Sequence, residues 1–148
     1  MISESGKFYK IVEEKNVAWH CGKSSWKKYE GLNNFSLGIE LDNPGHGVNY
    51  KSFSKRQMDS LVLLLQKILL KYNINYKNVL AHSDIAPERK LDPGELFNWS
   101  YLAKKKIAFF PSSKLEIFLP LSASTAFIRP TVKQELEPIP LLAGKSPS

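Results

Sequence analysis

The sequence predicts an α/β fold in which helices pack on a mixed central β-sheet. Three observations predict it: apolar residues alternate along residues 35–42, recur every three or four positions along residues 58–72, and form a short run at residues 79–81. A strand, a helix and a further strand in this order are typical of a sheet covered by helices. The 148 residues, 43% hydrophobic and 24% charged, have the size and composition of one globular domain.

The N-terminal residues predict part of a β-hairpin. Residues 8–12 form a short β-type run, and the turn signal Ser5-Gly6 precedes it. Residues 1–4 remain upstream of this turn to form the partner strand. Because a two-stranded ribbon needs further sheet or helix to be stable, we expect the chain to begin partway into the fold.

Residues 35–42 (FSLGIELD) predict a half-buried strand. Its apolar residues occupy alternate positions, so their side chains point to one face of the sheet: Phe35, Leu37, Ile39 and Leu41. Glu40 points to the opposite face. We therefore expect its carboxylate to line whatever surface that face of the sheet presents.

The clearest helix begins at Ser54. Ser54 and Gln57 have the spacing of a capping box, in which each side chain bonds a backbone N–H near the helix start. Apolar residues then recur at helical spacing and predict a core face: Met58, Leu61, Val62, Leu65, Ile68, Leu69 and Tyr72. After this helix, residues 79–81 predict a short buried strand that ends at His82, and residues 100–107 predict a final lysine-rich helix.

Residues 111–148 predict a proline-rich tail that is mostly extended or disordered. Six of the nine prolines lie in residues 111–148, and little periodicity is present there apart from an apolar run at residues 115–119. A linker or read-through remnant and a binding peptide are both compatible with this composition.

Composition excludes several classes of protein. The longest apolar run, residues 61–65, is far shorter than the roughly 18 residues that a membrane-spanning helix needs, and no secretory signal peptide is visible. A single cysteine, Cys21, excludes an internal disulfide and a cysteine-rich zinc finger. The net charge of +7 favours a polyanionic partner, which could be nucleic acid, an anionic membrane surface or a cell-wall polymer. Because no nucleic-acid-binding motif is present, we expect no nucleic-acid partner.

Two polar segments, residues 36–43 and 81–94, contain the residues that can perform chemistry. His82 and Asp92 provide an imidazole and a carboxylate, which suit Zn²⁺, although a catalytic zinc site commonly has three protein ligands. Lys90 lies two residues before Asp92 and can present an ammonium group to a substrate carbonyl. Glu40 can accept a proton from the attacking water. This set of residues predicts metal-assisted hydrolysis of an amide.

Four ordered blocks give the sequence a resemblance to a known family: AWHCGKSSW at residues 18–26, LNNFSLGIELDNPGHG at 32–47, the helix start FSKRQMDSLVLLL, and AHSDIAPERKLDPGELFNW at 81–99. These blocks resemble the zinc-dependent N-acetylmuramoyl-L-alanine amidases of the type 2 amidase family, which are similar to peptidoglycan recognition proteins. The resemblance covers residues 1 to about 103, which implies an amidase-like domain in residues 1–103 and a lysine-led, proline-rich and partly disordered tail in residues 104–148. It implies hydrolysis of the amide between the muramic acid lactyl group and L-alanine, in peptidoglycan or muropeptides.

The resemblance also implies roles for single residues. His82 and Asp92 resemble the second and third zinc ligands of the family. Glu40 resembles the carboxylate that activates the water, and Lys90 resembles the cation that stabilises the oxyanion.

The substrate groove is the other part of the implied site. Trp19, His20 and Gly22 match the W-H-x-G block on the wall of the groove, with Cys21 where the family usually has alanine, and Asn43 is expected beside them. We expect the partner to be peptidoglycan or a muropeptide, and we expect the protein to be a monomer.

One family block is absent from the sequence. Members of the family have their first zinc ligand in a block of the form V-x-H-Y or I-x-H-H, upstream of the segment that resembles residues 1–12. The resemblance therefore implies a chain that is truncated at its N-terminus, without the first strand of the sheet and with two of three zinc ligands. The alternative is a catalytically inactive peptidoglycan-binding module or a split-gene fragment. The compartment, bacterial cytoplasm or cell envelope, stays open.

Overall fold

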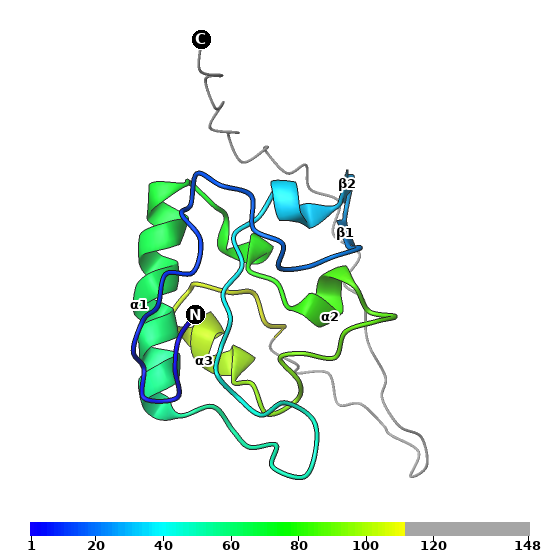
Figure 1. Ribbon diagram of the computed structural model, residues 1–148. Coiled ribbons are helices and arrows are strands. Elements are labelled where there is room, and N and C mark those ends of the chain that lie inside the picture. Colours follow the sequence, from blue (N-terminus) through cyan, green and yellow to red (C-terminus); the bar gives the residue numbers. More distant parts are fainter. Residues whose placement is uncertain (112–148) are drawn as a thin grey trace.

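The computed structural model describes residues 1–111. Its elements are the strands β1 (Ser25–Trp26) and β2 (Tyr29–Glu30), the 3-10 helices η1 (Leu32–Asn34) and η2 (Tyr76–Asn78), and the helices α1 (Lys55–Lys71), α2 (His82–Ile85) and α3 (Trp99–Lys104). Figure 1 shows α1 along one side of the molecule, the β1–β2 hairpin and α2 on the other, and residues 35–42 running between them.

The α/β class predicted from the sequence is confirmed, but strand pairing is much shorter than predicted. Ile2 forms an antiparallel bridge with Phe8 and a parallel bridge with Leu41, so three segments meet in a mixed arrangement at this one residue. The backbone N–H of Ile2 donates to the Glu40 carbonyl at 2.8 Å, and that of Asp42 donates to the Ile2 carbonyl at 2.9 Å.

Two of the predicted strands, residues 35–42 and 79–81, form no ladder within the described part of the chain, so their prediction is wrong. The predicted N-terminal hairpin is present in a short form, because Ile2 bridges Phe8 and the Tyr9 N–H donates to the Met1 carbonyl at 2.9 Å. The alternation in residues 35–42 is nevertheless real, since Ile39 and Leu41 pack against the main core cluster. A strand needs a bridged partner along its whole length, and among the described residues this segment is bridged only by Ile2.

The β1–β2 hairpin was not predicted from the sequence. Ser25 pairs with Glu30 and Trp26 pairs with Tyr29, around a turn in which Lys27 has a φ of 54°. Tight hairpin turns usually use Gly or Asn where φ is positive. A Lys-Lys turn therefore gives no sequence signal for this hairpin.

The start of α1 is confirmed, and half of the predicted capping box is wrong. The Ser54 hydroxyl oxygen accepts from the Gln57 N–H at 3.1 Å, as a helix cap does. The fully buried Gln57 side chain does not return to Ser54; its Nε2 donates to the carbonyls of Ile2 and Asp42, each at 3.0 Å. Gln57 thus ties the first turn of α1 to the two bridged segments.

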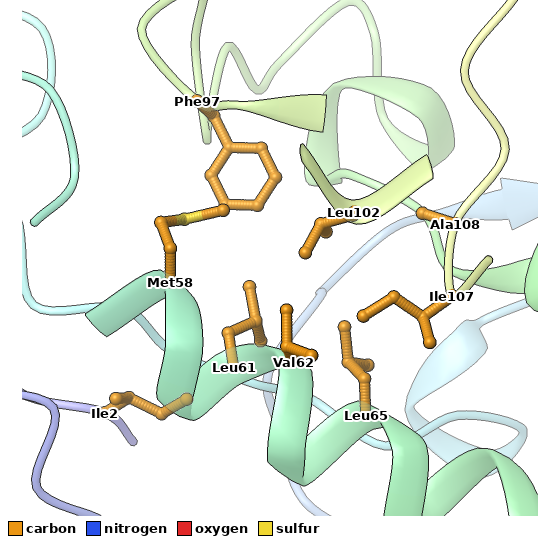
Figure 2. Packing of buried hydrophobic residues seen from close by; sticks show 9 residues of the cluster. All are labelled: Ile2, Met58, Leu61, Val62, Leu65, Phe97, Leu102, Ile107 and Ala108. Carbon is orange, nitrogen blue, oxygen red and sulfur yellow. The ribbon is translucent and has the colours of Figure 1, made fainter. Parts of the chain in front are cut away.

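The main core lies between α1 and the C-terminal part of the described chain. Figure 2 shows the α1 side chains of this cluster facing those that come from residues 97–108, with Ile2 at the edge: Met58, Leu61, Val62, Leu65, Phe97, Leu102, Ile107 and Ala108. A second cluster joins Cys21 and Leu32 to Ile85 of α2. No helix among the described residues has the length and apolar composition needed to cross a bilayer.

Helix α3 is shorter than the predicted span of residues 100–107. Asn98 caps its start by accepting from the Tyr101 N–H at 2.9 Å. At its end, Lys106 has a φ of 59°, and the Ile107 N–H donates to the Leu102 carbonyl at 3.2 Å. This reversal ends the helix and turns Ile107 into the core. The packed core therefore includes residues beyond 103, while the predicted tail after residue 111 lies outside the described residues.

The burial of Leu102 leads to a stability prediction. Leu102 is 0% exposed, so we expect Leu102→Ala to lower the free energy of unfolding by about 2–5 kcal/mol. Leu70, which is 86% exposed on α1, is the matched control, and Leu70→Ala should change this free energy by no more than about 0.5 kcal/mol. Urea unfolding measures both. Equal shifts in the two variants would contradict the assigned core.

Candidate functional site

An open cavity of about 960 Å³ lies between the face of α1, residues 35–41 and the N-terminus of α2. Six of the eight residues that the sequence analysis selected line it: His20, Glu40, Asn43, His82, Lys90 and Asp92. Trp19 and Gly22 are not among the lining residues, and the Trp19 side chain is 89% exposed. The polar residues selected from two distant sequence segments therefore meet at one cavity.

His82 and Asp92 are in direct contact. The His82 Nδ1 lies 2.5 Å from the Asp92 Oδ2, and the Ser83 N–H donates to the Asp92 backbone carbonyl at 3.1 Å. His82 is the first residue of α2 and does not end a strand as predicted. Its side chain is 17% exposed, whereas that of Asp92 is 53% exposed.

The hydrogen bond made by the His82 Nε2 determines whether the Nδ1 can donate or accept. The His82 Nε2 lies 2.9 Å from the His20 backbone carbonyl, which can only accept a hydrogen bond, so Nε2 holds the proton. In neutral His82 the Nδ1 lone pair then faces the Asp92 carboxylate. Two acceptors in contact require a cation between or beside them, either a proton or a metal ion. A histidine whose far nitrogen donates to a carbonyl is the usual arrangement of a metal ligand.

Imidazole nitrogen and carboxylate oxygen are both zinc donors, so this pair fits the metal that the sequence predicts. Within residues 1–111, however, no group of three or more His, Cys, Asp or Glu side chains is arranged to bind a metal ion. His82 and Asp92 are therefore two donors of an incomplete set in the described part of the chain.

Glu40 and Lys90 reach the cavity from different segments. Glu40 lines the cavity from residues 35–42, where its neighbours Ile39 and Leu41 also pack against the main core cluster, and the Ile2 N–H donates to its backbone carbonyl. Lys90 follows α2, where its N–H donates to the Ala86 carbonyl at 2.9 Å. Glu40 and Lys90 thus add a carboxylate and an ammonium group to the cavity that His82 and Asp92 also line, and groups of these types suit proton transfer and stabilisation of an oxyanion.

His20 lies against the backbone of residues 35–42. A Cβ at Gly38 would lie 2.6 Å from the His20 Cγ, so this contact needs a glycine at position 38. The His20 Nε2 lies 3.3 Å from the Ser36 hydroxyl. Burial lowers the pKa of His20 below its ordinary value and nearby His82 lowers it further, while Ser36 and the charge of Glu40 oppose the shift. The lowered pKa favours the uncharged ring of His20, which can both donate and accept a hydrogen bond.

Arg89, which was not predicted to belong to the site, holds the backbone around Gly22 at the end of the W-H-C-G block (residues 19–22). The Arg89 guanidinium donates to the carbonyls of Cys21 and Lys23, at 2.6 and 2.8 Å. Gly22 lies between these carbonyls, next to Arg89. These bonds join the block to the chain segment that precedes Lys90. The substrate-contact roles predicted for Trp19 and Gly22 stay predictions.

Asn43 lines the cavity, but its amide is used within its own loop. Its Oδ1 accepts from the Gly45 N–H and its Nδ2 donates to the Lys51 carbonyl, each at 3.0 Å. The same loop contains Tyr50, which the sequence analysis missed. The Tyr50 hydroxyl donates to the Pro93 carbonyl at 2.9 Å, next to Asp92. No local pattern signals such a contact, because it joins residues 43 positions apart.

The family of the protein follows from comparison with known sequences. A profile of the N-acetylmuramoyl-L-alanine amidase family matches residues 1–95, which is more than half of the chain. The chain belongs to this amidase family. The family predicted from the four sequence blocks is thereby confirmed.

Two curated amidases and one solved structure are similar to this chain. The N-acetylmuramoyl-L-alanine amidase AmiD of Escherichia coli is 42% identical over 113 residues, which are 73% of this chain and 41% of that protein. The 1,6-anhydro-N-acetylmuramyl-L-alanine amidase AmpD of Enterobacter cloacae is 38% identical over 100 residues, 68% of this chain and 51% of that protein. The structure of Escherichia coli AmiD with the substrate anhydro-N-acetylmuramic acid-L-Ala-D-gamma-Glu-L-Lys has a TM-score of 0.68 at 38% identity, and the match covers 74% of this chain and 44% of that one.

This member of the amidase family spans about half the length, or less, of the relatives it matches. What those longer proteins bind and cleave is therefore a property of their whole chains.

Proposed function

We propose that this protein hydrolyses the amide bond between N-acetylmuramic acid and L-alanine in peptidoglycan or muropeptides, with Zn²⁺ as its cofactor. The observation that supports this most strongly is the meeting of His82, Asp92, Glu40 and Lys90 at one cavity in a member of the amidase family. The similar AmiD structure, which contains an anhydro-muropeptide substrate, supports the same substrate class.

Each of the four residues has a distinct part in the proposed reaction. His82 and Asp92 would hold the zinc ion, which supplies a Lewis acid when bound. Glu40 accepts the proton of the attacking water and returns it to the leaving nitrogen of L-alanine. The Lys90 ammonium lies on the same cavity and stabilises negative charge as it develops on the scissile carbonyl oxygen.

The proposal is tested with purified protein, Zn²⁺ and anhydro-N-acetylmuramic acid-L-Ala-D-γ-Glu-L-Lys. We expect release of the free tripeptide, detected by mass spectrometry, at a rate well above that without protein. Chelation should abolish the release, and added Zn²⁺ should restore it. A protein that binds zinc and the muropeptide without releasing tripeptide would overturn the proposal.

A second candidate is a peptidoglycan-binding module without hydrolytic activity. The incomplete donor set within residues 1–111 favours it, because two protein ligands generally bind zinc more weakly than three. Equilibrium dialysis against Zn²⁺ and muropeptide separates the two candidates. Muropeptide binding with no bound zinc would support the module, whereas one tightly bound zinc ion per chain together with tripeptide release would exclude it.

A further inference from the structure

Two loops meet beside the candidate site through the side chain of Tyr50. The Tyr50 hydroxyl donates to the Pro93 carbonyl at 2.9 Å and accepts from the Leu96 N–H at 3.2 Å. One side chain therefore bonds the backbone on both sides of Gly94. This fixes the turn that begins immediately after Asp92.

Hydrogen bonds and a ring contact stabilise the loop that contains Tyr50. Asn43 closes its base through the bonds to Gly45 and Lys51 described above, and the Tyr50 N–H donates to the Gly47 carbonyl at 3.2 Å. The rings of His46 and Tyr50 lie 4.6 Å apart. A loop held at its base and at its tip can fix the position of a neighbouring segment.

The two loops pack closely against each other at Gly94. Gly94 has a φ of +80°, and a Cβ there would lie 2.2 Å from the Tyr50 Oη and 2.6 Å from the His46 Cε1. The His46 Nε2 also lies 2.8 Å from the Glu95 Oε2. Both aromatic side chains of the loop are therefore seated directly on the turn that follows Asp92.

Hydrogen bonds from other segments hold the backbone at Asp92. Its side chain is 53% exposed, so packing does not hold it in place. Its backbone carbonyl accepts from the Ser83 N–H at 3.1 Å, and the carbonyl of the next residue accepts from Tyr50. The segment is thus fixed to α2 on one side and to the Tyr50 loop on the other.

We infer that Tyr50 is a positioning residue, which holds the backbone at residues 92–96 so that the Asp92 carboxylate stays against His82. The consequence for metal binding rests on the proposed function, since it assumes that this pair holds zinc. The consequence for the backbone does not, since it concerns the hydrogen bonds of the metal-free protein.

The test compares Tyr50→Phe with Tyr101→Phe by amide hydrogen exchange. Tyr101 is the matched control, because its hydroxyl also makes a hydrogen bond, to Asp59 at 2.5 Å. In metal-free protein we expect Tyr50→Phe to speed exchange of the Ser83 and Leu96 amides by about tenfold, while α1 amides stay protected. Tyr101→Phe should leave the Ser83 amide unchanged. An unchanged Ser83 amide in Tyr50→Phe overturns the inference, and so does a general loss of protection, which would assign Tyr50 to global stability.

Zinc titration provides the second readout. Tyr50→Phe should weaken zinc binding by about tenfold, as changes beyond the direct ligands commonly do. In an Asp92→Ala background the same change should have no further effect, because Tyr50 acts through Asp92. An equal loss in both backgrounds overturns the inference. If the unaltered protein binds no zinc, the proposed function fails, and hydrogen exchange alone decides the role of Tyr50.

Discussion

We expect Glu40→Gln to lower kcat for cleavage of the muramoyl–L-alanine bond by about 10²- to 10⁴-fold, the usual contribution of a general base. Gln has nearly the same shape as Glu but cannot accept the proton of the attacking water. The backbone of residue 40 keeps its bond from Ile2, so the segment should stay in place. Because Glu40 lines the cavity without binding the metal in this proposal, KM and zinc content should change little.

Steady-state kinetics with the anhydro-muropeptide measure this effect. Glu30→Gln is the matched control, since Glu30 is an exposed residue of β2 that is not among those lining the cavity. This variant should keep the full rate. A Glu40→Gln protein that retains its rate would remove Glu40 from the mechanism and require another base.

The second large effect is expected for His82→Gln, which should weaken zinc binding by about 100-fold or more, since losing a direct ligand exceeds the effect of changes beyond the ligands. The variant removes one of the two donors in contact at the site and leaves Asp92 without its partner. The Gln amide can still donate to the His20 carbonyl, so the W-H-C-G block should keep its position. Hydrolysis should fall together with zinc content.

Titration against a competing chelator measures the zinc affinity of this variant. His20→Gln is the control, because the His20 ring contacts Ser36 and lies beside Gly38 rather than facing Asp92. It should bind zinc almost as tightly as the unaltered protein. If both histidine variants lost zinc to the same extent, the assignment of His82 as a direct ligand would be wrong.

Local patterns were sufficient for the main helix and for part of its packing. The apolar stripe from Met58 to Leu65 is buried as predicted, and Ser54 caps the helix. Both features depend on residues within four positions of one another, so sequence spacing contains the needed information. The strands were predicted less well, because pairing depends on a partner from elsewhere in the chain. Residues 35–42 alternate correctly but are paired only at Ile2.

The candidate site shows the same difference between features set by local sequence and features set by contacts between distant segments. His82, Asp92, Glu40 and Lys90 were selected from motif spacing, and all four line the cavity. Tyr50 and Arg89 were not selected, and Gln57 was expected only to cap its own helix, although each donates to a backbone carbonyl of another segment. Such contacts leave no periodicity and no motif. Trp19 was selected from a motif that implies the wall of the substrate groove. Its side chain is 89% exposed and is not among the residues that line the cavity.

By itself the sequence determined the family, the α/β class, the core helix and the chemical types of the site residues, because these depend on residue identity and short-range spacing. Only the tertiary structure decided that His82 presents Nδ1 to Asp92 with its other nitrogen on the His20 carbonyl, and that Tyr50 braces the turn after Asp92. Those arrangements join residues 10, 62 and 43 positions apart. A contact at such separation is set by how the whole chain packs, and no local stretch of sequence specifies it.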